Sequence, residues 1–301
     1  MKNSFKKIAV VATAFTLAFV PTANAAVLKA AGATSVSGLI DKCKADYQSA
    51  TGNSFDYPGG GSGAGKTAFT NGTVDFAFSD SVHSPLIPNE IHIPTVLWPV
   101  AILTNLPGSN KPVTLSTDTV AGIFSGKITK WNDPAIVADN NRTIKTIIYK
   151  KDSSGKVAKD AKGAPIVLRT QDVQQRRTMP NLDITVIYRS DNSGTSNNFT
   201  KALNALAPTI WTKPGSDAFA TAFPGDITSD PIGFQGGANA AQLGTLASST
   251  KYSITYNEYS FAVANGLGVA NVINPAGNAI APSSTEGLLA SFSLAKYAED
   301  R

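Results

Sequence analysis

The sequence has little of the chemistry that metal-dependent and nucleophilic enzymes use. One cysteine, Cys43, and two histidines, His83 and His92, occur in 301 residues. A lone cysteine cannot form an intramolecular disulfide, and we expect Cys43 to be a small apolar residue on a helix face. The histidines flank Pro85 and Pro88 without the spacing of metal ligands. We therefore expect no cofactor and no metal. A secreted phosphatase would need a nucleophile with a base or a metal cluster, so we keep it only as a less favoured alternative.

The sequence also lacks an N-terminal apolar run long enough to span a membrane. Ile8–Val20 follows three lysines but is too short. Ala23-Asn24-Ala25 then supplies the small residues that signal peptidase requires. We expect residues 1–25 to be a signal peptide cleaved after Ala25, which would deliver the chain to the periplasm. An uncleaved N-terminal anchor is the alternative.

A strong charge of one sign is missing from the expected mature chain. Removing the three signal lysines from the 26 basic residues leaves 23, against 21 acidic residues. A nearly neutral chain gives no reason to expect a nucleic-acid partner.

Short apolar segments alternate with helical patterns, which predicts an α/β fold. The chain after the signal peptide is long enough for two lobes, which we assign to residues 26–102 and 103–301. We predict strands at Val27–Ala31, Asn53–Tyr57, Thr73–Phe78, Ile184–Arg189 and Ile254–Tyr259. We predict helices from Thr34, Leu115 and Asn197, the first with Leu39, Ile40, Cys43 and Tyr47 on one face. Residues 150–180 are rich in lysine and arginine and are predicted to form a mobile hairpin or loop insertion; a basic arm that steers anions is the alternative.

A first candidate anion site follows the strand that ends at Arg189. Ser193-Gly194-Thr195 precede a helix, where unpaired backbone N–H groups and the helix dipole favour an anion. Arg189 adds a planar fork of donors that suits oxyanions. An ordinary helix cap would have the same residues.

Two further segments have the same character. Thr34-Ser35 lies between a predicted strand and a helix, where simple capping is the alternative. Ser62 lies in the glycine cluster 59–65. Such a cluster lets the backbone approach a ligand closely, and a flexible turn is the alternative. The letters from Gly60 to Thr67 match the nucleotide P-loop pattern. Asn71-Gly72 ends the following helix early, and a signal peptide leads away from ATP, so we do not favour nucleotide binding.

Asp80 ends the segment Thr73–Asp80 and adds a carboxylate beside these donors. Like charges repel, so its presence suits an anion that carries a proton. Protonated phosphate can donate a hydrogen bond to Asp80, whereas sulfate and molybdate cannot, which leaves other oxyanions as alternatives that Asp80 disfavours. Alone, an aspartate after a strand would be a turn residue.

Together these segments resemble the periplasmic phosphate-binding protein family of the high-affinity phosphate ABC transporter. The segments that carry the resemblance are Ala31-Gly32-Ala33-Thr34, Tyr57 with Gly59 to Gly65, Thr73-Val74-Asp75-Phe76 with Ser79-Asp80, Gly126-Lys127-Ile128 with Trp131, Arg189-Ser190-Asp191 with Ser193-Gly194-Thr195, and Tyr256 with Glu258-Tyr259.

The resemblance implies a two-lobed binding protein of type II-like architecture, with hinge strands, that closes over inorganic phosphate. It implies a monomer that delivers phosphate to a membrane permease. The phosphate-binding residues that it implies are Thr34, Ser35, Ser62, Asp80, Arg189, Ser193, Gly194 and Thr195. The chain departs from the family in having Ser35 where an aromatic residue is usual, in a longer insertion at 150–180, and in ending at Arg301. We therefore expect the C-terminal return of the chain to the first lobe to be truncated.

Overall fold

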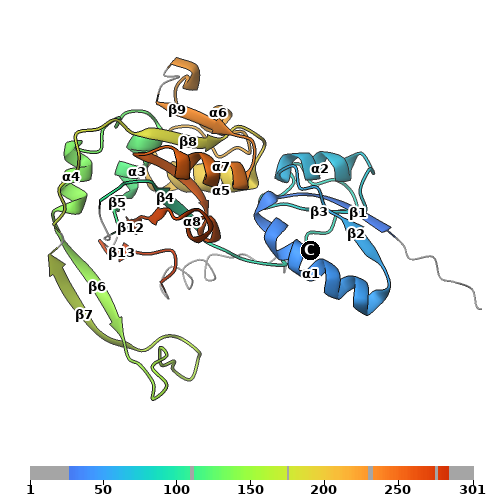
Figure 1. Cartoon of the computed structure of the whole chain (residues 1–301), viewed down its shortest axis with the longest axis horizontal. Helices are drawn as coiled ribbons and strands as arrows, with labels where there is room; N and C mark the ends of the chain where they lie inside the picture. Colours follow the sequence, from blue (N-terminus) through green and yellow to red (C-terminus); the bar gives the residue numbers. More distant parts are fainter. Residues whose placement is uncertain (1–26, 109–111, 175, 230–232, 275–276, 285–301) are drawn as a thin grey trace, which may run out of the picture.

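The structure, a computed structural model, describes residues 27–108, 112–174, 176–229, 233–274 and 277–284. The predicted signal peptide lies outside these residues. The end of the chain, where we expect the return to the first lobe to be truncated, also lies outside them. Two α/β lobes are joined by residues 82–99, which belong to no helix or strand (Figure 1). This arrangement confirms the predicted two-lobed α/β fold.

The first lobe is a parallel three-stranded sheet in the order β2-β1-β3. Helices α1 and α2 lie on opposite sides of it (Figure 1). The elements are β1 (Val27–Gly32), a 3-10 turn (Thr34–Val36), α1 (Ser37–Thr51), β2 (Ser54–Asp56), α2 (Ser62–Thr70) and β3 (Phe76–Phe78). Its buried apolar core is small and consists of Val36, Ile40 and Phe55, with partly buried aromatic rings around them.

Glycine is required at Gly32, where β1 ends. Its φ is +132°, and a Cβ there would overlap the carbonyl oxygen of Phe78 on β3. Gly65 of α2 packs directly against Gly32, since a Cβ at Gly65 would collide with the Gly32 Cα. The Gly32 carbonyl also accepts the N–H of Gly61 at 2.8 Å. These contacts hold the start of α2 at the carboxyl end of β1.

The second lobe contains a five-stranded sheet in the order β11-β4-β10-β8-β9. Strands β8, β9 and β10 are parallel, whereas β4 runs antiparallel to both of its neighbours. The strands are β4 (Val100–Thr104), β8 (Thr185–Arg189), β9 (Phe234–Gly237), β10 (Ser253–Glu258) and β11 (Gly268–Val269). The lobe boundary assigned after residue 102 falls within β4, all of which pairs with β10.

Helices cover both faces of this sheet, because successive side chains of a strand point to opposite faces. On one face Val186 and Tyr256 pack with α3 (Thr117–Phe124) and α5 (Gly194–Leu206). Phe199 of α5 stacks on Tyr256, with ring centroids 4.3 Å apart. On the other face Ile187 packs with α7 (Ala240–Ser249). Helix α8 (Tyr259–Asn265) continues directly from β10.

Most of the predicted insertion at 150–180 lies in a two-stranded hairpin that projects from the second lobe and ends at Gln174 (Figure 1). Its strands are β6 (Thr143–Tyr149) and β7 (Val167–Gln174), and every residue of β7 is exposed. The segment therefore forms the predicted hairpin, while its being an insertion, its mobility and its action on anions stay predictions. The remaining elements are β5 (Thr114–Ser116), α4 (Pro134–Asn140), α6 (Phe219–Ala222), a 3-10 turn (Ile227–Ser229), β12 (Asn271–Ile273) and β13 (Ala279–Ile280).

The apolar face predicted for α1 is only partly correct. Ile40 is buried and Tyr47 is half-buried, but Leu39 and Cys43 are exposed. The first lobe offers α1 only a narrow contact, chiefly with β2. A periodic apolar pattern sets which residues share a helix face, but the width of the neighbouring surface decides how many of them are covered.

Candidate functional site

Four strands end where the two lobes meet. Strands β1 and β3 of the first lobe end at Gly32 and Phe78, and β8 and β10 of the second end at Arg189 and Glu258. The carboxyl ends of parallel strands are the usual ligand-binding edge of α/β proteins. All eight predicted binding residues end or follow one of these strands or lie at the start of α2 or α5: Thr34, Ser35, Ser62, Asp80, Arg189, Ser193, Gly194 and Thr195.

Asp80 is the centre of this cluster. Its carboxylate accepts hydrogen bonds from the hydroxyl of Ser35 at 2.7 Å and from that of Thr195 at 3.1 Å. Its backbone N–H donates to the Ser62 hydroxyl at 3.1 Å. Asn198 of α5 donates to its carbonyl at 2.6 Å. The second lobe therefore holds Asp80 through both its side chain and its backbone, and donors from both lobes surround it.

The start of α5 lies tightly against the first lobe at Gly194. A Cβ on Gly194 would lie 2.6 Å from the Ser62 hydroxyl, 2.7 Å from the Ser81 nitrogen and 2.8 Å from the Asp80 Cβ. On the facing side, the N–H of Gly63 donates to the carbonyl of Asn192 at 2.9 Å. The N-termini of α2 and α5, which carry positive ends of helix dipoles, thus face each other across the lobe contact.

Arg189 is buried, with 2% of its surface exposed, and it forms a bidentate pair with Asp191. Its Nε and one terminal nitrogen each donate to an Asp191 carboxylate oxygen at 2.6 Å. Its backbone N–H donates to the Tyr256 hydroxyl at 3.1 Å. This pairing fixes the plane of the guanidinium and compensates its burial.

The other two predicted segments have different local partners. Ser193 caps α5 through its hydroxyl, which accepts the N–H of Ser196 at 3.3 Å. The Thr34 hydroxyl accepts the N–H of Ala240, at the start of α7, at 3.2 Å. The described contacts of the Thr34 side chain therefore lie at α7, beside the Asp80 cluster rather than within it.

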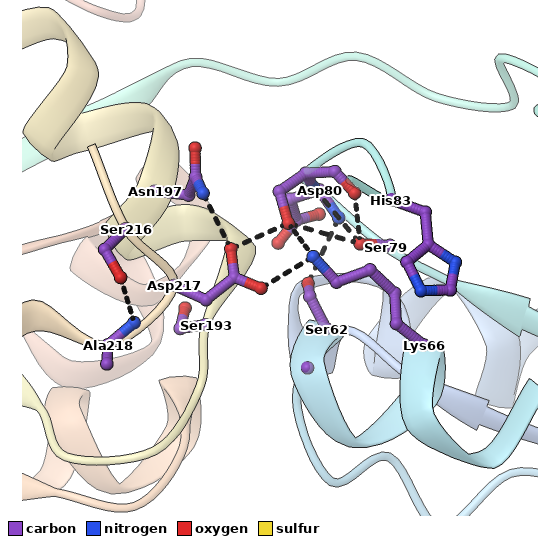
Figure 2. Close-up of polar contacts among 12 residues, drawn as sticks. Ser62, Lys66, Ser79, Asp80, His83, Ser193, Asn197, Ser216, Asp217 and Ala218 are labelled. Carbon is purple, nitrogen blue, oxygen red and sulfur yellow. Dashed lines mark hydrogen bonds and ion pairs between the residues drawn. The ribbon is translucent and has the colours of Figure 1, made fainter. Parts of the chain in front are cut away.

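A second interlobe contact involves Lys66 of α2 and Asp217 of the second lobe, which sequence reasoning did not identify. Lys66 Nζ lies 2.7 Å from Asp217 Oδ2 and donates to the Ser81 hydroxyl at 2.8 Å (Figure 2). Ser81 and Asn197 each donate to Asp217 Oδ1 at 2.9 Å. Lys66 is the lysine of the P-loop pattern, and here it neutralises a carboxylate of the other lobe. Asp217 lies in a loop whose sequence matches no motif, so no local pattern indicated its contact with the first lobe.

Glu258 is the second site residue that sequence reasoning missed, although it belongs to a segment of the resemblance. It is the last residue of β10 and is 2% exposed. Its Oε1 accepts the hydroxyl of Thr195 at 2.9 Å, the same hydroxyl that lies 3.1 Å from Asp80. One threonine therefore links two carboxyl groups.

Three carboxyl groups in and beside the site have shifted pKa values. Burial raises the pKa of Asp80 above its ordinary value, against the hydrogen bonds from Ser35 and Thr195. Burial and then the charge of Asp80 raise the pKa of Glu258 to about 7. Burial would also raise the pKa of Asp217, but its hydrogen bonds and the charge of Lys66 outweigh burial and lower it. The pKa values of Asp80 and Glu258 are therefore raised, whereas that of Asp217 is lowered.

Two cavities border the cluster. One of ≈180 Å³ is lined in part by Asp80, Thr195 and Glu258, and one of ≈740 Å³ runs along the first lobe past Lys66 and Asp80. Neither lining contains Arg189. In this arrangement the donors around Asp80 are paired with protein acceptors, so an anion would have to replace some of those contacts.

Among the described residues, no group of three or more histidine, cysteine, aspartate or glutamate side chains could hold a metal ion. Within the same residues, every helix is too short or too polar to cross a membrane. His83 and His92 instead both contact Glu90, at 3.1 and 2.8 Å.

Comparisons with known proteins agree on one family. A model described as a PBP superfamily domain matches residues 20–298. The phosphate-binding protein PstS of Haemophilus influenzae is 31% identical over 94% of this chain and 73% of its own length. The phosphate-binding protein PstS2 of Mycobacterium bovis is 32% identical over 83% of this chain.

One solved structure shows the same fold. The phosphate-binding protein of Stenotrophomonas maltophilia superposes with a TM-score of 0.55 at 24% identity, over 82% of this chain and 64% of that one. The chain spans 59% of the length of the mycobacterial relative. The family model covers most of the chain, and the Haemophilus relative is matched over nearly three quarters of its length. The chain therefore belongs to the PBP superfamily and, within it, to the family of phosphate-binding proteins called PstS.

Proposed function

We propose that this protein captures inorganic phosphate between its two lobes and delivers it to the membrane permease of an ABC importer. The observation that carries the proposal is the position of Asp80. A buried carboxylate surrounded by hydroxyl donors, with the starts of two helices beside it, fits an anion that is itself a hydrogen-bond donor. The names of the PstS relatives support the same ligand.

The proposed roles of the site residues follow from their chemistry. The hydroxyls of Ser35, Ser62 and Thr195 would donate to phosphate oxygens, as would the N–H groups at the start of α5. Arg189, held by Asp191, would provide the positive charge that balances the anion. The proposed set is Thr34, Ser35, Ser62, Asp80, Arg189, Ser193, Gly194 and Thr195.

Selectivity would come from Asp80. Phosphate near neutral pH keeps at least one proton, which it can donate to the carboxylate. Sulfate has none, and it would face Asp80 with two unshared acceptors in a buried site. Asp80 should therefore favour phosphate over sulfate or molybdate. The protein would bind and release phosphate without changing it chemically.

Three accompanying proposals concern the working form of the protein. We propose that residues 1–25 direct export, that the protein acts in the periplasm and that it is a monomer. The expected division into lobes after residue 102 is also a proposal, and the pairing of the whole of β4 with β10 favours a boundary just before β4.

Calorimetric titration of the chain with phosphate and then with sulfate tests the proposed function. We expect heat from phosphate alone. Binding of sulfate with the same affinity as phosphate would contradict the role proposed for Asp80. The absence of heat from phosphate, with circular dichroism showing a folded chain, would contradict the function itself.

A matched pair of threonine variants locates the site in the same experiment. Thr195→Val removes a hydroxyl proposed to donate to the anion and should weaken phosphate binding roughly 10- to 100-fold. Thr245→Val removes an exposed hydroxyl of α7 that donates to the carbonyl of Ala241, away from the cluster. It should leave the affinity unchanged, and an equal loss in both variants would contradict the proposed location.

A further inference from the structure

Glu258 lies in a position that is unfavourable for a charged carboxylate. It ends β10 inside the second lobe and only 2% of it is exposed. Its Oε1 accepts the Thr195 hydroxyl, and its Oε2 has no hydrogen-bond partner among the described residues. A buried carboxylate with one unpartnered oxygen lacks hydrogen bonds that it would have in water.

The Thr195 hydroxyl cannot satisfy both of its carboxyl neighbours. It lies 2.9 Å from Glu258 Oε1 and 3.1 Å from Asp80 Oδ2, and a hydroxyl has one proton. If both carboxyl groups were charged, one of these short contacts would bring two acceptors together. A proton on one carboxyl group removes the conflict, because that group then donates to the threonine oxygen.

Glu258 is the group that fits this proton better. Each carboxylate oxygen of Asp80 has a hydroxyl donor, from Ser35 at 2.7 Å and from Thr195 at 3.1 Å, whereas Glu258 Oε2 has no hydrogen-bond partner among the described residues. The charged groups that face Glu258 are Asp80 from the first lobe and Arg189 from β8. The neighbouring β4 and α8 contain no aspartate, glutamate, lysine, arginine or histidine. Burial and the Asp80 charge together hold the pKa of Glu258 near 7, against the opposing effects of the Thr195 hydrogen bond, a backbone hydrogen bond and the charge of Arg189.

We propose that Glu258 is a positioning residue that stays protonated when phosphate binds and donates its proton to Thr195 Oγ1. The single hydroxyl proton of Thr195 is then free to point toward the anion. Glu258 acts through Thr195 and does not touch the ligand. The inference rests on the proposed function, and it assigns to the site a neutral carboxyl group behind the donor, in addition to the charged Asp80.

Ionisation of Glu258 would reverse this arrangement. As the pH rises through about 7, the carboxylate becomes an acceptor and takes the Thr195 proton for itself. Phosphate then loses one donor and gains a nearby negative charge. Both changes weaken binding, so affinity should fall with rising pH beyond what the titration of phosphate itself causes.

The test compares wild type with Glu258→Gln, titrated with inorganic phosphate between about pH 5.5 and 8.5. The glutamine amide can donate to Thr195 at every pH, so it mimics the protonated acid. We expect the two proteins to agree within about twofold at the acid end, and wild type to bind roughly tenfold more weakly than the variant at the alkaline end. The ionisation of phosphate is common to both proteins and cancels in their ratio.

A second pair of variants separates positioning from a general electrostatic effect. In a Thr195→Val background, the substitution Glu258→Gln should no longer change the pH profile, since the hydroxyl that transmits the effect is gone. Parallel profiles of wild type and Glu258→Gln would overturn the inference while leaving phosphate binding intact. No binding of phosphate by the folded wild type at any pH would overturn the proposed function, and this inference with it.

Infrared spectra of the ligand-free wild type give a measurement that requires no variant to fold. The carbonyl stretch of a protonated carboxyl group should be present near pH 6 and should disappear toward about pH 8. Its absence near pH 6 would show that Glu258 is already charged and would overturn the inference.

Discussion

Asp80 is the residue that we propose to decide which anions the site accepts. It lies among donors from both lobes, and its burial raises its pKa above the ordinary value. In a site built only from donors, sulfate and phosphate would compete as similar tetrahedral anions. A single carboxylate distinguishes them, because it needs a donor and only phosphate provides one.

Replacing Asp80 with asparagine should remove this discrimination. The amide can donate to sulfate, so sulfate affinity should rise while phosphate affinity falls, with a combined loss of selectivity of at least roughly 100-fold. Competition calorimetry measures both. Asp56→Asn, an exposed change on β2, is the control and should keep the wild-type preference. Unchanged selectivity in Asp80→Asn would contradict the role of the carboxylate.

Glu258 should also make stability depend on pH. Its pKa in the folded chain is about 7, above the ordinary 4.5 that it would have when unfolded. The protonated form favours folding, so its contribution is fully present below about 4.5 and is lost as the pH rises through about 7. Wild type should lose on the order of 3 kcal/mol of unfolding free energy relative to Glu258→Gln over this range. Urea unfolding at several pH values measures this difference. A constant difference between the two proteins would contradict it.

The starts of α2 and α5 carry several of the proposed donors, and their contact depends on the missing side chain of Gly194. Its nearest neighbours all belong to the first lobe: Ser62, Ser81 and Asp80. A methyl group at this point would separate the two helix starts, and with them the donors that an anion must reach at the same time.

Gly194→Ala should therefore weaken phosphate binding while the second lobe stays folded. The added Cβ would lie 2.6–2.8 Å from three atoms, two of them in or bonded to the backbone, which cannot move as a side chain tip can. We expect a loss of at least roughly tenfold in affinity, measured by calorimetry. Gly38→Ala in α1 has open space around it and should be neutral or slightly stabilising. Equal affinities in the two variants would contradict the proposed contact.

The helix that became α5 was predicted from the sequence, although its start was placed at Asn197 rather than at Gly194. The helix after Arg189 was recognised because its cap chemistry is local: Ser193, Gly194 and Thr195 are adjacent. The predicted strands at Val27, Ile184 and Ile254 were correct to within a residue at each start. The pairing of Thr195 with Glu258, 63 residues apart, left no local pattern and could be found only in the folded chain. The prediction that Leu39 lies on a packed helix face was wrong for the opposite reason. Its local pattern is apolar, but no neighbouring surface covers it.

The two lobes are held together by few charged contacts, and the pair of Lys66 with Asp217 is the shortest ion pair described between them. Both side chains are mostly buried, with 16% and 17% exposed, and Ser81 and Asn197 complete the partners of the carboxylate. A protein that binds its ligand between two lobes gains affinity from any contact that forms only when the lobes meet. The ion pair is a contact of this kind, because Lys66 belongs to the first lobe and Asp217 to the second.

Lys66→Met should favour separated lobes and weaken phosphate binding without touching the proposed site. It keeps the apolar stem but removes the charge, and a partly exposed pair should contribute about 1 kcal/mol, or roughly fivefold in affinity. Small-angle scattering should show a more open ligand-free chain, and calorimetry the lower affinity. Lys130→Met is the matched control, because Lys130 pairs with Asp183 at 3.0 Å within the second lobe, where both side chains are exposed. If both variants bind phosphate as wild type does, the Lys66 pair contributes nothing to closure, and the hydrogen bonds between the lobes, such as those of Asp80 and that of Gly63 with Asn192, are sufficient.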